Sequence, residues 1–359
     1  MKRILCIITC LLLTGQIAAC SSAGTDPNED NSQSIQTTEN SDPGEISTAQ
    51  REIFAMDTYM TLTAYGDRCE EALDAAEAEI EHIEGLLSVG IASSEISVIN
   101  SEGQGRVSAE TGEIIDTALH IYETTDGAFD ITVYPLMELW GFTGSDPHLP
   151  SDDEIQETLG DVGSDRISVE DDLVQLDKGQ GIDLGGIAKG YTSDRIMEIF
   201  EEYDLVSGMV SLGGNVAFYG AKTDGSLWRC GIRDPFNSAN RQAVYGIISV
   251  SDRSVITSGA YERYFEENGI RYHHILDPST GYPAESGIVS ATIVGCEGVE
   301  ADALSTACYV MGIEKSEQYW KNSDIDFDMI LIDEEGDIYI TEGIADSFES
   351  DHSVNVIRK

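Results

Sequence analysis

Residues 329–341 have the sequence MILIDEEGDIYIT, in which two strand-forming runs enclose a short acidic loop. The first run is 329–332 and the second is 338–341, and both are rich in isoleucine. Gly336 lies in the loop between them. Apolar runs separated by a few residues that include glycine predict a β-hairpin. The C-terminal part of the chain is therefore expected to contain antiparallel strands.

Further strands and helices are expected on the N-terminal side of this hairpin. Residues 207–212, with the sequence SGMVSL, and residues 288–294 have the apolar character of buried strands. An amphipathic helix is expected over 70–87 and a second helix over 114–125. The apolar stripe of the first helix consists of Leu73, Ala76, Ile80, Ile83 and Leu87. Because helices and strands are mixed without regular strand–helix–strand alternation, the sequence predicts the α+β class.

The first 20 residues have the layout of a secretory signal. Lys2 and Arg3 precede an apolar run over 4–13, and the segment IAAC ends at Cys20. This ending resembles a bacterial lipobox, in which the cysteine is acylated. The alternative is an ordinary secretion signal that contains a cysteine. We expect Cys20 to be lipidated and the protein to be anchored to the cell membrane on its extracytoplasmic side.

Residues 21–50 carry almost no large apolar side chain. Such a segment cannot bury enough surface to offset the entropy of ordering it, so we expect a flexible polar tether. Residues 51–359 have a globular composition and form the expected folded domain. A second membrane-spanning segment is not apparent in the sequence.

The chain of 359 residues is strongly acidic, with 20 basic and 66 acidic side chains and a formal net charge of −46. This balance argues against nucleic acid as a partner, because phosphate backbones are bound by clustered lysine and arginine. A small anionic ligand stays compatible with it, since such a ligand requires only a local positive site or a metal ion.

Four cysteines lie beyond the signal segment: Cys69, Cys230, Cys296 and Cys308. Their spacing matches no metal-binding pattern. They can form up to two disulfides outside the cytoplasm or remain isolated buried thiols, and the sequence leaves both alternatives open.

Residues 183–191, DLGGIAKGY, place two glycines ahead of an expected helix. A helix N-terminus offers free N–H groups to an anion, and Lys189 adds a positive charge for a phosphate. The segment has neither the P-loop nor the dinucleotide-binding glycine spacing. It is therefore either a phosphate-binding turn or an ordinary turn before a helix.

Asp302 and Thr306 lie four residues apart in an expected helix, so their side chains share one face. A carboxylate and a hydroxyl one turn apart can bind Mg²⁺, with further ligands from water, carbonyls or phosphate. The alternative is a capping arrangement at the helix N-terminus.

His274 is expected at the end of a strand, because Pro278 disfavours helix at Asp277. A histidine in that place can act as a general base near neutral pH. The alternative is a purely structural histidine.

Five segments of the chain are unusually rich in glycine, aspartate, threonine and histidine. They are GAFDIT at 127–132 with LWGF at 139–142, DLGGIAKGY at 183–191, SLGGN at 211–215, TSG at 257–259 with HHILDPSTG at 273–281, and ADALST at 301–306. Taken together, from about residue 54 to about residue 312, they resemble the ApbE family of FAD:protein FMN transferases. The resemblance implies one large two-lobed ApbE-like domain, with mixed or antiparallel sheets flanked by helices.

The resemblance also implies roles for individual residues. The residues that would contact FAD are Met56, Ala128, Phe129, Asp130, Asp183, Lys189 and Leu276. Mg²⁺ would be held by the backbone carbonyl of Gly186 and by the side chains of Asp302 and Thr306. His274 would be the base, and the turn at 213–215 would approach the cofactor closely.

The sequence departs from parts of the family at two positions. Some members carry an aromatic residue near Gly90, where it can stack on the flavin, and some carry an additional acidic residue at the position of Ser305. These departures bear on flavin orientation and on the charge of the metal site.

The resemblance implies a Mg²⁺-dependent transfer of FMN from FAD to a threonine or serine hydroxyl of a target protein, with release of AMP. The implied partners are acceptor flavoproteins or membrane redox subunits. One alternative is an FAD pyrophosphatase, in which water replaces the acceptor hydroxyl. Another is a non-enzymatic flavin-binding or solute-binding lipoprotein.

Overall fold

The computed structural model describes residues 46–359, apart from residues 145, 238, 241 and 296. The expected signal segment with Cys20, most of the expected tether, and Cys296 lie outside the described residues. Strand β1 (Thr48–Ala55) begins three residues before Arg51, where the sequence composition places the start of the domain.

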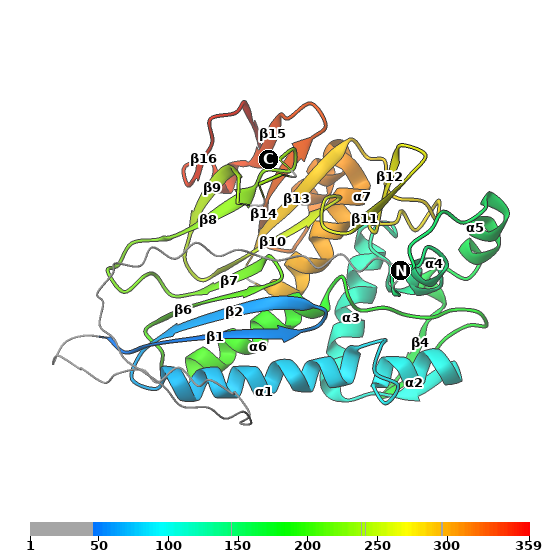
Figure 1. Cartoon of the computed structure of the whole chain (residues 1–359), viewed down its shortest axis with the longest axis horizontal. Helices are drawn as coiled ribbons and strands as arrows, with labels where there is room; N and C mark the ends of the chain where they lie inside the picture. The colour runs from blue at the N-terminus through cyan, green and yellow to red at the C-terminus, as the bar shows by residue number, and fades with distance from the viewer. Residues whose placement is uncertain (1–45, 145, 238, 241, 296) are drawn as a thin grey trace, which may run out of the picture. The chain divides into compact units, whose positions relative to one another are not determined.

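The expected C-terminal hairpin is confirmed. Strands β14 (Phe327–Asp333) and β15 (Ile338–Thr341) pair antiparallel across the acidic loop. They belong to a nine-stranded sheet of order β1-β2-β6-β7-β10-β13-β14-β15-β17, in which only β15 and β17 are parallel neighbours (Figure 1). The other strands are β2 (Thr58–Tyr65), β6 (Ser207–Leu212), β7 (Asn215–Tyr219), β10 (Arg253–Gly259), β13 (Ile288–Gly295) and β17 (Val354–Ile357). The α+β class is confirmed, and the predicted strand 207–212 has the bounds of β6.

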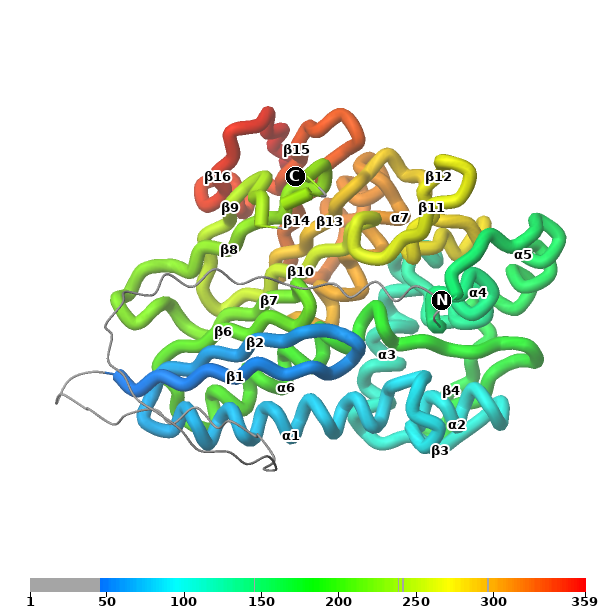
Figure 2. The backbone as a smooth tube through the Cα atoms, viewed as in Figure 1, coloured from blue at the N-terminus to red at the C-terminus, as the bar shows by residue number. Residues whose placement is uncertain are grey.

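One face of this sheet is covered by three helices: α1 (Cys69–Leu87), α6 (Ala188–Glu202) and α7 (Gly298–Asn322) (Figures 1 and 2). The stripe predicted for the first helix is buried as expected, and Leu73 and Ile80 pack with Leu62 of β2 and Phe200 of α6. Spacings of three and four residues keep these side chains on the side of α1 that faces the sheet. The helix is thereby fixed along β1 and β2.

The opposite face is covered at one end by a second sheet, formed by β8 (Trp228–Arg233), β9 (Val244–Val250) and β16 (Phe348–Glu349). Alternate residues of β14 point to opposite sides, because side chains in a strand alternate. Ile330 and Ile332 pack against this second sheet, whereas Met329 and Leu331 pack with the helices. Burial of both faces explains why residues 329–332 form an uninterrupted apolar run.

The remaining elements surround the end of the domain that carries the glycine-rich segments. Helix α3 (Ala109–Thr124) begins five residues before the predicted start at Ile114, because the Ser108 hydroxyl caps it by accepting from the Thr111 N–H. Shorter elements here are α2 (Glu95–Glu102), β3 (Gln104–Arg106), α4 (Tyr134–Leu139), α5 (Asp152–Leu159), β4 (Ser168–Glu170), β5 (Leu173–Gln175), β11 (Tyr264–Glu267) and β12 (Ile270–His273).

Three of the four cysteines under consideration lie in the described part of the chain. Cys69, Cys230 and Cys308 are free thiols there, and Cys69 and Cys308 are buried. The same described part contains no helix long and apolar enough to cross a membrane.

Candidate active site

The segment 183–191 forms a tight turn that leads into α6. The Asp183 carboxylate accepts a hydrogen bond from the Gly185 N–H at 2.8 Å, which closes the turn. Lys189, in the first turn of α6, donates from Nζ to the Gly185 carbonyl at 3.2 Å. The expected glycine turn before a helix is therefore present, with its lysine folded back over it.

Gly190 lets α6 and α7 approach each other closely. A Cβ atom at this position would lie 2.1 Å from the Gly298 carbonyl oxygen and 2.7 Å from the Asp302 Cβ. Only glycine fits such a contact, since real Cβ atoms do not come this close to a backbone oxygen. The helix crossing brings Asp302 to the N-terminus of α6.

Asp302 is held there by two hydrogen-bond donors and a cation, which come from α6 and β7. The Gly190 N–H donates to its Oδ2 at 2.9 Å, the Asn215 side-chain amide donates to its Oδ1 at 2.9 Å, and Lys189 Nζ lies 3.9 Å from Oδ2. Burial raises the pKa of Asp302, and the charge of Lys189 opposes that rise. The carboxylate is thus fixed in position beside a cation.

The left-handed glycines of the 213–215 turn aim Asn215 at Asp302. Gly213 and Gly214 have φ values of 64° and 101°, which allow the short connection between β6 and β7. The family resemblance implies that this turn approaches the cofactor, and its described side-chain contact is the hydrogen bond that orients Asp302.

Thr306 and Gly186 lie close to each other. A Cβ atom at Gly186 would be 3.9 Å from the Thr306 hydroxyl oxygen and 3.2 Å from the Phe129 ring. The Thr306 hydroxyl is also 3.1 Å from the Ser258 hydroxyl, which in turn lies 2.7 Å from the Ser305 hydroxyl. Ser305 is fully buried in this hydroxyl cluster.

The oxygen atoms of Asp302, Thr306 and Gly186 are of the chemical types that bind magnesium. Asp302 offers a carboxylate, Thr306 a hydroxyl and Gly186 a backbone carbonyl, and Mg²⁺ prefers such hard oxygen ligands. Groups of three or more His, Cys, Asp or Glu side chains suited to a metal do not occur in the described ranges. An ion here would therefore depend on water and substrate phosphate for its remaining ligands.

His274 directly follows β12, as the sequence predicted. Its Nδ1 lies 3.1 Å from the carbonyl oxygen of Arg263, and a carbonyl can only accept, so Nδ1 carries the hydrogen. The Nε2 lone pair is then available to take a proton. The ring is partly exposed but enclosed on most sides, and this burial, with the charge of Arg263, lowers the pKa of His274 to about 3.

Arg263 is a cation that sequence reasoning missed. Burial raises the pKa of the Asp183 carboxyl, and the positive charges of Arg263 and Lys189 oppose this rise, so both cations act on the same region. Among the described residues, the exposed guanidinium of Arg263 makes no hydrogen bond or ion pair. No local sequence pattern indicates that Arg263 lies near His274, because the two residues are eleven positions apart along the chain.

Met56 lies in a strained turn between β1 and β2. Met56 and Asp57 have φ values of 48° and 58°, a left-handed conformation that is uncommon for residues other than glycine. The Met56 N–H donates to Glu84 at 2.8 Å, and its sulfur lies 3.8 Å from the Thr192 hydroxyl of α6. Strain of this kind concentrates at functional sites, and the turn places Met56 over the start of α6.

The other residues predicted to contact FAD divide into two groups. Phe129 is buried against Gly186, next to the predicted metal position. Asp130 is buried, and its carboxylate accepts from the N–H and hydroxyl groups of both Thr132 and Ser164. Its side chain is therefore committed to holding the chain together.

Ala128 and Leu276 lie farther from this centre. Ala128 lines a separate cavity of about 700 Å³ between α3 and α7. Leu276 is buried in the apolar cluster around Trp140, so the described contacts of its side chain are structural. Gly90, where the sequence departs from some family members, is exposed in the turn after α1.

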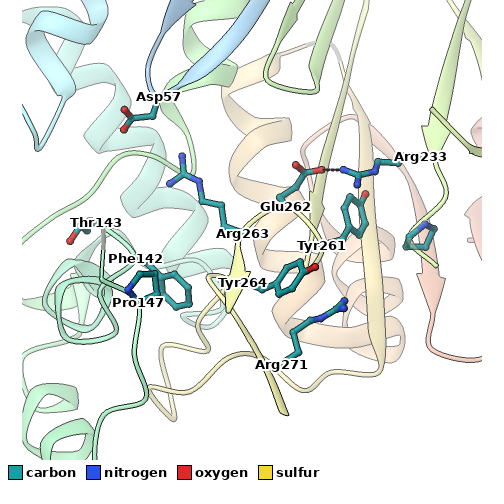
Figure 3. Close-up of a pocket in the computed structure, with 12 residues that line it drawn as sticks. Asp57, Phe142, Thr143, Pro147, Arg233, Tyr261, Glu262, Arg263, Tyr264 and Arg271 are labelled. Atoms are coloured by element: carbon teal, nitrogen blue, oxygen red, sulfur yellow. Dashed lines mark hydrogen bonds and ion pairs between the residues drawn. The ribbon is translucent and has the colours of Figure 1, made fainter. Parts of the chain in front are cut away.

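A larger cavity, of about 780 Å³, is lined by Phe142 and Arg263 (Figure 3), and both of these residues contact His274. It lies between the β1–β2 turn, residues 142–144 with Pro147, and the β11–β12 hairpin. The Phe142 ring lines it and also meets the His274 ring edge-on, with centroids 6.4 Å apart. The His274 ring therefore contacts a residue that borders a space which a second molecule can enter.

Comparison with known proteins accounts for this combination of features. The model of the ApbE family matches residues 56–331, which is more than half of the chain. This chain belongs to the ApbE family. The resemblance predicted from the five segments is thus confirmed.

Sequence and structure comparisons with individual ApbE proteins support this family assignment. A protein of Treponema pallidum named FAD:protein FMN transferase is 33% identical over 282 residues, covering 72% of this chain and 77% of that protein. The ApbE protein of Thermotoga maritima has a crystal structure with a TM-score of 0.78 and 36% identity, covering 84% of this chain and 99% of that one. The flavin transferase ApbE of Vibrio cholerae gives a TM-score of 0.75 and 27% identity, with 84% and 100% coverage. The single-domain ApbE architecture is therefore confirmed.

Proposed function

We propose that this chain is an FAD:protein FMN transferase that moves FMN from FAD to a threonine or serine hydroxyl of another protein and releases AMP. The observation that carries the proposal is the convergence on one glycine turn of an oriented carboxylate and a lysine whose charge acts on a histidine with a free Nε2. Asp302 and Lys189 reach this turn from α7 and α6, and the charge of Lys189 acts on His274, which follows the end of β12. The names of the relatives support the same reaction.

The cations and the helix end suit the binding of a pyrophosphate. The positive end of the α6 helix dipole lies at this turn, and Lys189 and Arg263 supply positive charge beside it. A bound Mg²⁺, held by Asp302, Thr306 and the Gly186 carbonyl, would neutralise further phosphate charge. Phosphoryl transfer depends mainly on such positioning and charge stabilisation.

His274 is placed to accept the proton of the attacking hydroxyl. The acceptor oxygen forms a bond to the FMN-side phosphorus, and the pyrophosphate P–O bond breaks. The hydroxyl proton moves to His274 Nε2, and AMP leaves with the bonding electrons. The low pKa keeps the imidazole neutral in the free protein, and the negative phosphates oppose the nearby Arg263 and raise the basicity of His274 when FAD is bound.

The test uses the full chain with FAD, MgCl₂ and a candidate acceptor domain. Mass spectrometry follows covalent flavin on the acceptor, and chromatography follows AMP. We expect His274→Gln to lower transfer by about 100-fold or more. The matched control is His82→Gln, because His82 is an exposed histidine on α1 with its own carboxylate partner, Glu110. Equal transfer by the two variants would remove His274 from the mechanism.

Hydrolysis of FAD is the second reaction that the site can support. The cavity beside His274 is open, so water can occupy the place of the acceptor hydroxyl. Release of AMP without flavin on any acceptor would indicate this pyrophosphatase activity.

We also propose that the enzyme acts on the extracytoplasmic face of the cell membrane, anchored through Cys20. The support is the signal-like segment 1–20 and the polar segment that follows it. Membrane fractionation of a Cys20→Ala variant tests this, since loss of the anchor should release the protein. Retention of that variant in the membrane would exclude the lipid anchor.

A further inference from the structure

The cavity beside His274 concentrates positive charge in an acidic chain. Three arginines line it, Arg233, Arg263 and Arg271, together with Asp57 and Glu262 (Figure 3). The chain as a whole has 20 basic and 66 acidic side chains. The excess of cationic over anionic side chains around this cavity is therefore the reverse of the charge balance of the chain.

Two of the three guanidinium groups are available to a ligand. Arg233 is paired with Glu262 at 2.8 Å and lies over the Tyr261 ring, so these two charges compensate each other. Arg271 lies over the Tyr264 ring at 4.1 Å and has only a long contact of 3.4 Å with the exposed Glu266. Arg263 has no hydrogen-bond or ion-pair partner for its guanidinium in the described part of the chain.

The β11–β12 hairpin presents these groups on a fixed surface. The two strands pair with each other alone in the described structure. On one face of the hairpin, Phe265 and Tyr272 pack against Trp140. Because strand residues alternate, Tyr264 and Arg271 lie on the opposite face, toward the cavity.

Apolar groups accompany the arginines around the cavity. Tyr264 is 40% exposed, and it lines the cavity together with Phe142. Exposed aromatic side chains next to arginine are characteristic of surfaces that bind proteins. Pro147 lines the other side of the cavity.

Two residues that line the cavity, Arg263 and Phe142, contact His274. The backbone carbonyl of Arg263 accepts the hydrogen bond from His274 Nδ1, while the Arg263 side chain lines the cavity. The residues predicted to bind pyrophosphate and metal, among them Lys189 and Asp302, do not line it. The cavity therefore adjoins the expected FAD site without being part of it.

We propose that this cavity binds the acceptor protein, as an extended segment with aspartate or glutamate residues beside the hydroxyl that receives FMN. This inference rests on the proposed transferase function. Carboxylates of the segment pair with Arg263 and Arg271, its backbone and apolar groups lie along Tyr264 and Phe142, and its hydroxyl points at His274 Nε2. A second copy of this chain is disfavoured as the occupant, because two molecules of net charge −46 repel each other.

The experiment compares two short synthetic peptides with a central threonine, one flanked by aspartate and glutamate and the other by asparagine and glutamine. The full chain is used in detergent, with FAD and MgCl₂. Fluorescence anisotropy measures peptide binding, mass spectrometry measures flavin transfer, and flavin fluorescence measures the Kd for FAD.

The test variant is Arg271→Glu and its matched control is Arg229→Glu. The side chains of Arg271 and Arg229 are 45% and 48% exposed, and each has one exposed glutamate partner. We expect Arg271→Glu to weaken binding of the acidic peptide by about ten-fold at low salt and to leave the Kd for FAD unchanged. Arg229→Glu should change neither value by more than about two-fold.

Several results would overturn the proposal. Equal binding of the two peptides, or equal effects of the two variants, would show that the cavity does not select acidic segments. A weaker affinity for FAD in Arg271→Glu would assign the cavity to the dinucleotide, and loss of a dimer on sedimentation would assign it to self-association. A wild-type protein that fails to bind FAD would instead refute the proposed function, since peptide binding is measured separately.

Discussion

Gly190 offers the most direct test of how the two helices build the site. In Gly190→Ala, the new Cβ atom would meet the Gly298 carbonyl oxygen at 2.1 Å and its carbon at 2.6 Å. These are backbone atoms, so α6 and α7 must separate by about 1 Å to relieve the contact. We expect a loss of about 3 kcal/mol in the free energy of unfolding. Because Asp302 is held by the Gly190 N–H, its displacement should also lower transfer by about 100-fold.

Urea unfolding, followed by circular dichroism, measures the first effect, and flavin transfer measures the second. The control is Gly85→Ala in α1, where a Cβ atom would meet nothing within 4 Å. This exposed helical position should gain about 0.5–1 kcal/mol from the same change. If Gly190→Ala kept wild-type stability and transfer, the close crossing of α6 and α7 would not be what positions Asp302.

Two further predictions concern charge. Asp302→Asn keeps the shape of the side chain and removes its charge, so calorimetric titration in the presence of FAD should show Mg²⁺ affinity reduced by about ten-fold or more; an unchanged affinity would place the ion elsewhere. His273 is buried, and burial lowers its pKa to about 4, so the folded state disfavours its protonation. The stability that depends on neutral His273 is fully present above pH 6.5 and is lost as the pH falls toward 4. The free energy of unfolding should fall by about 2 kcal/mol between pH 7 and pH 5 for this reason. His273→Gln should remove that part of the pH dependence in urea unfolding, and an identical pH dependence in both proteins would contradict it.

The parts of the fold that the sequence predicts well are those decided by neighbours along the chain. The stripe of α1, the strand 207–212 and the hairpin at 329–341 follow from side-chain periodicity and from a glycine-containing loop. The start of α3 was predicted five residues too late, because the apolar pattern begins after the Ser108 cap. A helix can extend beyond its apolar stripe when a capping side chain satisfies its first N–H groups.

The parts of the site that the sequence did not predict depend on contacts between distant residues. Asn215 orients Asp302 across 87 positions of sequence. Asp194 of α6 caps α7 by accepting from the Gly298 and Val299 N–H groups, across more than 100 positions. Neither contact leaves a local pattern, since each residue type is ordinary in its own segment. Asp130 shows the reverse case, because the resemblance gives it a ligand-binding role while its carboxylate is fully used by Thr132 and Ser164.

The β11–β12 hairpin connects recognition of the acceptor to the chemistry at His274. The carbonyl of Arg263 fixes the hydrogen on His274 Nδ1, whereas the side chain of the same residue faces the cavity. A segment that binds Arg263 therefore contacts the residue whose backbone orients the base. Its carboxylates also reduce the positive potential of Arg263, which is one cause of the low pKa of His274. Binding of an acidic acceptor should thus raise the basicity of His274 at the moment when a hydroxyl is present to be deprotonated. A water molecule carries no negative charge and would not raise the basicity of His274, so transfer to the acceptor should be favoured over hydrolysis.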